Sequence, residues 1–228
     1  MSKYIEVIVI VEGKTEQIFI ESILNPYLGH KNIGIHATQV SKPGQKGGDV
    51  KFSRVKKDIE LHLRQRKDTY ISTLVDYYGT REWPGIEDVP DKACPAKIAE
   101  VLYRATKEKV VSLFSDLMAD KRFIPYISVH EFEALLFSDA EILSKELGIS
   151  CTTVEKVLSE CGSPEAINNN PSTAPSKRLE NWSSSGTFLK TTAGINIADK
   201  IGVEKMRKHC LLFNEWIETL EKLQEESR

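Results

Sequence analysis

Five acidic side chains stand where apolar segments of the chain end. Glu12 follows the run IEVIVIV, and Glu16 comes four residues later. Asp76 directly follows YISTLV, and Glu131 and Glu133 come just after FIPYISV. Carboxylate oxygens are the ligands that Mg²⁺ and Mn²⁺ prefer, and a few of them from different elements suffice for a site. The spacing therefore predicts a divalent-metal site, provided that the fold brings these segments together.

Such a site suits the hydrolysis of a phosphodiester. Two ions about 3.5 to 4 Å apart hold the attacking water and the departing oxygen. Glu12 and Glu16 are spaced so that both can face the same side. Glu131 and Glu133 share one face in a strand but lie about 200° apart on a helix, so we predict Glu131 as the primary ligand and Glu133 as a supporting group or a ligand of the other ion. His130 is a further candidate ligand or proton carrier.

Each of these residues also has a structural interpretation. An acid near a helix N-terminus is favourable without any ligand, and Asp76 could instead be an N-cap or turn residue. The segment Gly13-Lys14-Thr15 resembles the end of a phosphate-binding P-loop, but that motif requires glycine five positions before Gly13, where Ile8 stands. A Walker-type ATPase is therefore excluded. Lys14 remains a candidate for neutralising a phosphate, or a solvated surface amine.

The elements that must position these residues alternate between strand and helix. Segments rich in Ile and Val predict strands at about 4–11, 33–40, 70–75 and 123–129. Apolar stripes at helical spacing predict helices at about 15–28, from 52 onward and at about 96–118. This alternation predicts an α/β fold with a mostly parallel sheet flanked by helices. The functional crevice of such a sheet lies at the carboxyl ends of its strands, where the acids stand.

The remaining segments are loops and a helical extension. We predict a surface loop at 41–50, which is rich in Gly and Pro, and an inserted lid or loop at 80–95. The residues 131–133 begin a helix that continues through ALLFSDAEIL. After about residue 162 the composition changes to Asn, Ser and Pro, and short helices lead to a final one at 214–226. We therefore predict a catalytic domain at 1–150 and a helical extension at 151–228 packed on it.

Composition limits the class of protein. The chain has 228 residues, 40% hydrophobic and 28% charged, and no run of roughly 18 apolar residues that could span a bilayer. Four cysteines without a C-x-x-C pair favour reduced thiols. The short apolar run near the N-terminus is interrupted by charges and precedes no small-residue cleavage site, which favours a strand in a cytoplasmic protein. The net charge is −2, yet nine Lys or Arg against three acids stand between 42 and 67. This stretch could follow a nucleic-acid backbone or be a solvated helix surface. Trp83, Trp182 and Trp216 could stack on bases or lie in the core.

Six segments together resemble a bacterial Toprim-like family of about this length: VIVIVEGKTEQIF, LVDYYG, WPG, SVHEFEALLFSD, PSKR and CLLFNEWIETLE. The resemblance covers nearly the whole chain. Members are often encoded beside an ABC-type ATPase, an arrangement similar to the fused ATPase and Toprim nuclease of the overcoming-lysogenization-defect proteins. It implies a Toprim/Rossmann-like fold and work in anti-phage defence or DNA processing.

The resemblance also implies roles for single residues. The first acidic motif of the family falls on Glu12, with Glu16 as its partner on the helix, and the aspartate motif falls on Asp76. The usual pattern there is Asp-x-Asp, whereas this chain has Tyr78 at the second position, which places full two-metal stoichiometry in question.

The nuclease relatives place a further acid after the next strand, which corresponds here to Glu131-Phe132-Glu133. They also use a lysine later in the chain, and Lys190 in FLKTTAG is the candidate.

The resulting hypothesis is a nuclease subunit that uses Mg²⁺ or Mn²⁺ to hydrolyse nucleic acid, DNA rather than RNA, with an ABC-type ATPase as partner and no membrane association. A catalytically silent scaffold subunit of such an ATPase and a phosphatase or nucleotide hydrolase are the alternatives. Assembly into a homo-oligomer is left open by the sequence.

Overall fold

The sheet is parallel throughout. The computed structural model of the chain describes residues 4–42, 45–46, 50–78, 80–129, 131–167, 170 and 172–226. The strand order is β2-β1-β5-β6, with β7 also paired to β5, and every pair is parallel. The strands are β1 (Ile5–Val11), β2 (Ile33–Gln39), β5 (Thr69–Asp76), β6 (Phe123–Ile124) and β7 (Ile127–Ser128). The expected α/β class is confirmed.

β1 is the central strand because its residues tolerate burial on both faces. Val7, Val9, Ile10 and Val11 have no exposed surface, and such a continuous apolar run is typical of a strand covered by helices on both sides. β2 lies on one side of β1 and β5 on the other. The chain therefore moves from β1 outward to β2 and then crosses back to β5, which creates a crevice where the two connections diverge.

The register of the strands decides which side chains meet at that crevice. Val11 at the end of β1 pairs with Leu74 of β5, and Asp76 pairs with Ser128 of β7. Glu12, one residue beyond Val11, and Asp76, two residues beyond Leu74, thus leave the sheet at the same edge.

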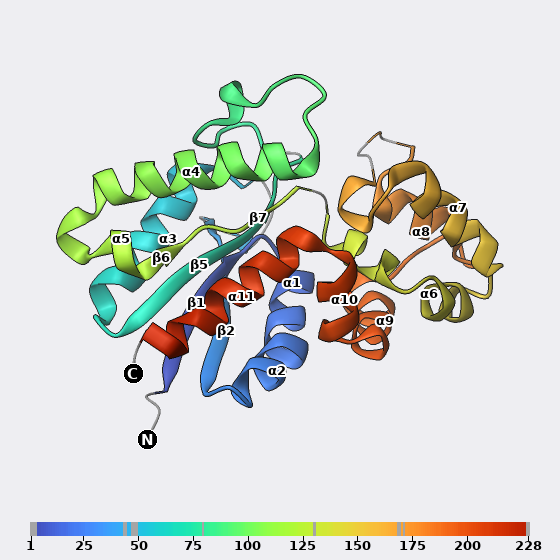
Figure 1. Ribbon diagram of the computed structural model, residues 1–228, viewed down its shortest axis with the longest axis horizontal. Coiled ribbons are helices and arrows are strands. Elements are labelled where there is room, and N and C mark those ends of the chain that lie inside the picture. The colour runs from blue at the N-terminus through green and yellow to red at the C-terminus, as the bar shows by residue number, and fades with distance from the viewer. Residues whose placement is uncertain are drawn as a thin grey trace.

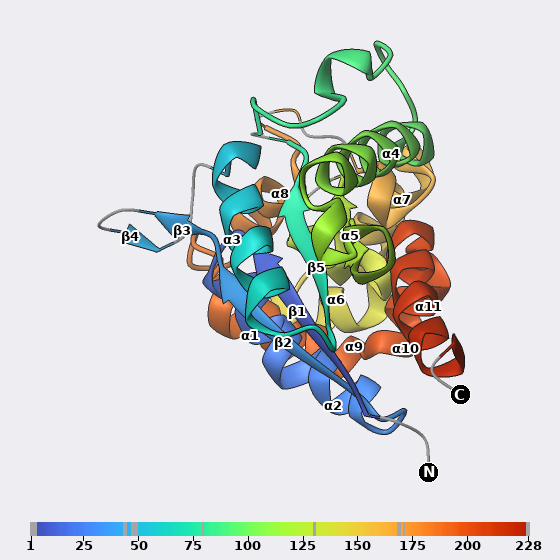
Figure 2. The ribbon, with the colours of Figure 1, turned by 90° about the vertical axis from the view of Figure 1, so that its left-hand side faces the viewer.

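Helices cover both faces of the sheet (Figures 1 and 2). Figure 2 shows α3 and α11 on opposite sides of the strands. The expected inner face of α3 is confirmed, since Phe52, Val55, Ile59 and Leu63 are all buried. The elements up to β6 are α1 (Lys14–Phe19), π-helical η1 (Ile20–Leu24), α2 (Asn25–Gly29), α3 (Phe52–Gln65), 3-10 turn η2 (Ile86–Asp88), α4 (Pro95–Leu113), 3-10 turn η3 (Ser115–Leu117) and α5 (Ala119–Arg122).

The helix expected at 15–28 is one continuous rod, α1-η1-α2, with a wide π turn just before Pro26. Proline has no N–H to donate, and the wider turn is a common way to accommodate such a break inside a helix. In the segment expected as a loop, β3 (Ser41–Lys42) and β4 (Gln45–Lys46) form a short antiparallel pair. Its remaining residues 43–44 and 47–49 lie outside the described ones.

The strand expected at 123–129 is interrupted. β6 ends before Pro125, which cannot donate a ladder hydrogen bond. The side chain of Thr73 bridges the gap instead, because its hydroxyl donates to the carbonyl of Tyr126 at 2.9 Å and accepts from the N–H of Tyr126 at 3.2 Å. β7 then resumes the pairing with β5. The prediction of one continuous strand was wrong, because a proline inside the strand interrupts the ladder of hydrogen bonds.

Two expected helices are also divided. The helix placed at 96–118 ends at Leu113, and Met118 adopts a left-handed conformation with φ of 56° before α5 begins. The helix expected from Glu131 is 3-10 helix η4 (Phe132–Ser138) followed by α6 (Ala140–Leu147). Asp139 separates them because its carboxylate accepts a hydrogen bond from the N–H of Ile142 at 3.0 Å, which starts a new helix.

The C-terminal helices form a group beyond the carboxyl ends of the strands, and the last of them returns to the sheet (Figure 1). They are α7 (Cys151–Cys161), 3-10 turn η5 (Pro164–Ala166), α8 (Pro175–Trp182), π-helical η6 (Lys190–Gly194), α9 (Ile195–Ile201), α10 (Val203–His209) and α11 (Leu211–Glu226). One continuous hydrophobic cluster includes residues of the sheet and of these helices.

The tryptophans serve packing. Trp216 of α11 stacks on Tyr126 with ring centroids 4.4 Å apart and donates to Ser72 Oγ at 3.0 Å. Trp83 is buried and donates to Thr106 Oγ1 at 2.8 Å, which anchors the 80–95 loop on α4. Trp182 is partly exposed and contacts Phe137.

All four cysteines are free thiols, as expected. Across the described residues, none of the helices combines the length and the apolar composition that crossing a bilayer requires.

The partly buried carboxylate of Glu221 ties α11 to the rest of the fold, because it pairs with two cations from other segments. Lys31 Nζ and Arg207 Nη1 lie 2.5 and 2.7 Å from Glu221 Oε1. Burial disfavours the charged carboxylate, but the hydrogen bonds from Lys31 and Arg207 outweigh it and lower the pKa of Glu221. The contribution is therefore present above the ordinary glutamate pKa of about 4.3 and is lost as pH falls through the lower folded value.

We expect Glu221→Gln to lower the free energy of unfolding by about 1 to 2 kcal/mol at pH 7. Urea denaturation at pH 7 and at pH 3 measures the effect, and the difference from wild type should shrink at the lower pH. Glu100→Gln, which removes an exposed pair with Lys97, is the matched control and should cost less. A loss that is the same at both pH values would contradict this account.

Candidate functional site

A cleft of about 470 Å³ lies at the carboxyl edge of the sheet. The strand ends, the start of α1, η4 and η6 all contribute to its walls. All seven residues singled out in the sequence line it, together with Gly13, Thr15 and Tyr78: Glu12, Lys14, Glu16, Asp76, Glu131, Glu133 and Lys190. The fold thus brings the candidates together. His130, the other candidate, lies outside the described residues.

The end of β1 supplies two of the carboxylates. Glu12 leaves the strand, and the backbone turns at Gly13 into α1. Glu16 Oε2 accepts a hydrogen bond from the N–H of Gly13 at 3.0 Å. A side chain at Gly13 would meet that oxygen, since a Cβ there would lie 3.3 Å from it. Glu16 therefore stabilises the helix start with one oxygen, in line with its structural interpretation, while the residue also faces the cleft.

Asp76 is the last residue of β5 and lies among the other acids. Burial raises its pKa well above the usual range, and the negative charges of Glu16, Glu12, Glu133 and Glu131 raise it further. A buried aspartate with four acidic neighbours is costly to ionise.

Glu131 is held by a residue 45 positions later in the chain. Ser176 Oγ donates to Glu131 Oε1 at 2.9 Å, and the N–H of Ser176 donates to Glu131 Oε2 at 2.9 Å. Ser176 stands in the first turn of α8, so the carboxylate also lies at the positive end of that helix. Ser176 lies in the segment PSKR, whose only signal in the sequence is the family resemblance, and it was not predicted to contact Glu131.

Glu133 lies deeper than Glu131. Its side chain is 2% exposed, and Lys190 Nζ is 3.0 Å from its Oε1. Among the described residues, Oε1 of Glu133 accepts no hydrogen bond. Its contact with Lys190 is therefore an ion pair. Burial raises the pKa of Glu133. Burial opposes the charged form of Lys190, but Glu133, Glu131 and Asp76 outweigh it and raise the pKa of the ammonium.

The two glutamates reach one cleft because their backbones differ. Glu131 has φ of −58° and ψ of 154° and precedes η4, whereas Glu133 belongs to its first turn. The prediction that a helix would point Glu131 and Glu133 in different directions assumed that both residues are helical. Glu131 is the more exposed and is fixed by α8, while Glu133 is the buried one paired with lysine.

The cleft as a whole has an excess of negative charge. Burial is the largest cause of the raised pKa of Glu12 and of Glu16, and a neighbouring carboxylate raises each further. Lys14 is exposed, and its Nζ lies 3.3 Å from Gln17 Oε1. Five carboxyl groups thus face the charges of two lysines, and among the described residues Lys190 is the one of the two that pairs with an acid.

These residues fit a divalent cation in chemical type. Hard oxygen donors, partial burial and uncompensated negative charge are what Mg²⁺ and Mn²⁺ require. Among the described residues, no group of three or more His, Cys, Asp or Glu side chains is arranged to hold a metal ion. Tyr78 takes the place in the cleft where the resemblance implies a second aspartate.

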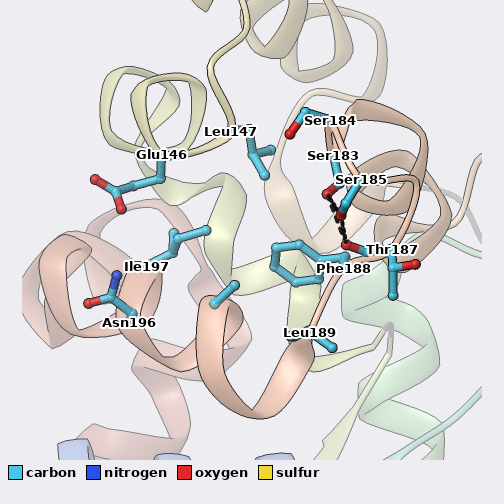
Figure 3. Close-up of a pocket in the computed structure, with 11 residues that line it drawn as sticks. Glu146, Leu147, Ser183, Ser184, Ser185, Thr187, Phe188, Leu189, Asn196 and Ile197 are labelled. Carbon is cyan, nitrogen blue, oxygen red and sulfur yellow. Dashed lines mark hydrogen bonds between the residues drawn. The ribbon is translucent and has the colours of Figure 1, made fainter.

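A second cavity of about 330 Å³ lies on the other side of η6 (Figure 3). Phe188, Leu147 and Ile197 supply apolar walls, and the serines of the 183–185 turn lie at one side. Its single acid, Glu146, is paired with Lys200 at 2.6 Å. We assign the chemistry to the carboxylate cleft, because this cavity lacks a cluster of titratable groups.

The contact between Ser176 and Glu131 predicts a coupled pair. Ser176→Ala should lower the free energy of unfolding by about 1 to 2 kcal/mol, because Oε1 loses a donor at a partly buried carboxylate. In a double-mutant cycle with Glu131→Gln, measured by urea denaturation, the two losses should be less than additive. Strict additivity would show that the two side chains do not interact.

One of three comparisons with known proteins identifies a family. Searches of curated proteins and of solved structures find no match to the chain. A family model described as a domain of unknown function, DUF4276, matches residues 11–221, which include every residue of the cleft. The chain belongs to the DUF4276 family.

Proposed function

We propose that this chain is a metal-dependent nuclease subunit that hydrolyses nucleic-acid phosphodiesters with Mg²⁺ or Mn²⁺. One observation carries the proposal: carboxylates from β1, α1, β5 and the η4 segment face one cleft at the switch point of a parallel sheet. Burial and mutual repulsion make these carboxylates costly to ionise in the absence of a cation. A bound divalent cation relieves that cost.

Each residue has a role in this proposal. Glu12, Asp76 and Glu131 hold the metal, and Glu16 and Glu133 complete the shell. The bound ion would supply an activated water and stabilise the departing oxygen.

The lysines and Ser176 act on charge and position. Lys14, exposed at the mouth of the cleft, attracts the phosphate, and Lys190 stabilises negative charge that develops on it. Ser176 orients Glu131 through its two hydrogen bonds.

A macromolecular substrate is favoured by the surroundings of the cleft. α3 begins near the same edge of the sheet, because the N–H of Phe52 bonds to Glu82 of the loop that follows β5. Its first turns carry Arg54, Lys56 and Lys57, which can contact a phosphate backbone. At the far end of the stretch, Arg64 and Arg66 are paired with acids. Lys42 and Lys46 lie outside the residues whose side chains are described.

The resemblance to the overcoming-lysogenization-defect nucleases extends the proposal. It favours DNA over RNA as substrate, an ABC-type ATPase as partner and a role in anti-phage defence. These assignments rest on the resemblance alone.

Removing a ligand should abolish cutting without harming the fold. Glu12→Gln and Asp76→Asn should each reduce Mn²⁺-dependent cleavage of plasmid or single-stranded DNA by about 100-fold or more. Their melting temperatures at pH 7 should equal or exceed that of wild type, because each removes a charge that is repelled by its neighbours. Glu180→Gln, an exposed acid on α8 paired with Lys177, is the control and should cut like wild type. Cleavage retained in either cleft variant contradicts the assignment.

A catalytically silent scaffold subunit is the second candidate, and specific contacts favour it. Tyr78 replaces one expected ligand, Ser176 engages both oxygens of Glu131, and Lys190 already neutralises Glu133. Calorimetric titration with Mn²⁺ separates the two functions. The nuclease requires a heat of binding that disappears in Asp76→Asn, whereas the scaffold gives the same trace for both proteins.

A further inference from the structure

The buried carboxylate of Glu133 already has a cation beside it. The side chain is 2% exposed, and the ammonium of Lys190 lies 3.0 Å from Oε1. An ionised carboxylate at such depth requires a counter-charge, because burial removes the water that would otherwise stabilise it. Lys190 supplies this charge from η6, which follows Glu133 by more than fifty residues.

The other lysine of the cleft has a different partner. Lys14 Nζ lies near Gln17 Oε1, an uncharged amide oxygen, and its side chain is exposed. Lys14 therefore adds positive charge to the cleft without pairing with any carboxylate in the part of the chain that the structure describes. Comparing the two lysines can therefore separate an effect of the Lys190–Glu133 contact on metal binding from the effect of one positive charge anywhere in the cleft.

A divalent cation that took Glu133 Oε1 as a ligand would compete with the Lys190 ammonium for this oxygen. Two positive groups cannot both approach Oε1 closely, because they repel each other where little water screens them. The backbone of η6 is held in place, since Gly194 packs against the buried ring of Phe188 and a Cβ there would lie 3.4 Å from that ring. The Lys190 side chain is 42% exposed and has room to turn away. The side chain, and not the helix, is the part that moves.

We propose that Lys190 is an internal counter-ion of Glu133 that an entering divalent cation displaces, so that metal loading frees the ammonium to face the substrate phosphate. This inference rests on the proposed metal site. It adds an order of events, in which Lys190 becomes available to the phosphate only after the metal is bound. In the metal-free protein, Lys190 therefore partly neutralises the acid cluster and does not face the substrate phosphate.

The test compares two isosteric neutral variants. Lys190→Met should bind Mn²⁺ about 10-fold more tightly than wild type in calorimetry, because the competitor is gone. Lys14→Met should change the dissociation constant by less than about 3-fold, because only the general field changes. Without metal, Lys190→Met should melt below wild type, and saturating Mn²⁺ should raise its melting temperature by more than it raises that of wild type.

Each outcome has one meaning. Equal tightening in both variants assigns the effect to net charge and overturns the inference, as does unchanged or weaker binding in Lys190→Met. In both cases binding by the wild type still supports the proposed metal site. A wild type that gives no heat with Mn²⁺ overturns the metal site itself, and the inference with it.

A charge-preserving variant keeps the test decisive if Lys190→Met does not fold. Lys190→Arg retains the cation, and its planar group has several donors for the Glu133 carboxylate. It should bind Mn²⁺ more weakly than wild type. Affinity equal to or tighter than that of wild type in Lys190→Arg contradicts the competition.

Discussion

The repulsion between desolvated carboxylates at one edge of the sheet is the interaction on which the rest of this structure depends. The fold could have dispersed these acids into solvent, where their mutual effect would be small. Instead the register of β1 and β5 brings Glu12 and Asp76 to one edge, and η4 adds Glu131 and Glu133 opposite them. Such an arrangement lowers the stability of the folded state, and groups of this kind cluster at functional sites.

The structure offsets this repulsion with three local contacts. The N–H of Gly13 stabilises Glu16, the first turn of α8 stabilises Glu131 through Ser176, and Lys190 stabilises Glu133. Burial and four neighbouring carboxylates raise the pKa of Asp76 well above its usual range.

The C-terminal helices belong to the site as much as the sheet does. Ser176 and Lys190 both come from the segment expected as an extension, and each contacts an acid of the η4 segment. α11 then packs on the sheet through Trp216, which holds the helical group against the strand ends. Removal of residues after 150 would thus take away both the cover of the sheet and two groups that hold the carboxylates.

The sequence by itself determined β1, β2 and β5, the inner face of α3, and the position of the acids close after apolar segments, because these follow from short-range periodicity and from the direction of parallel strands. It also contained Pro125 and Asp139, whose local effects divide the expected fourth strand and the helix after it. Only the tertiary structure decided that Glu131 is held by Ser176 and Glu133 by Lys190. Those choices depend on how helices distant in the chain pack against the sheet, and packing is set by the combined shape of many side chains rather than by any local pattern.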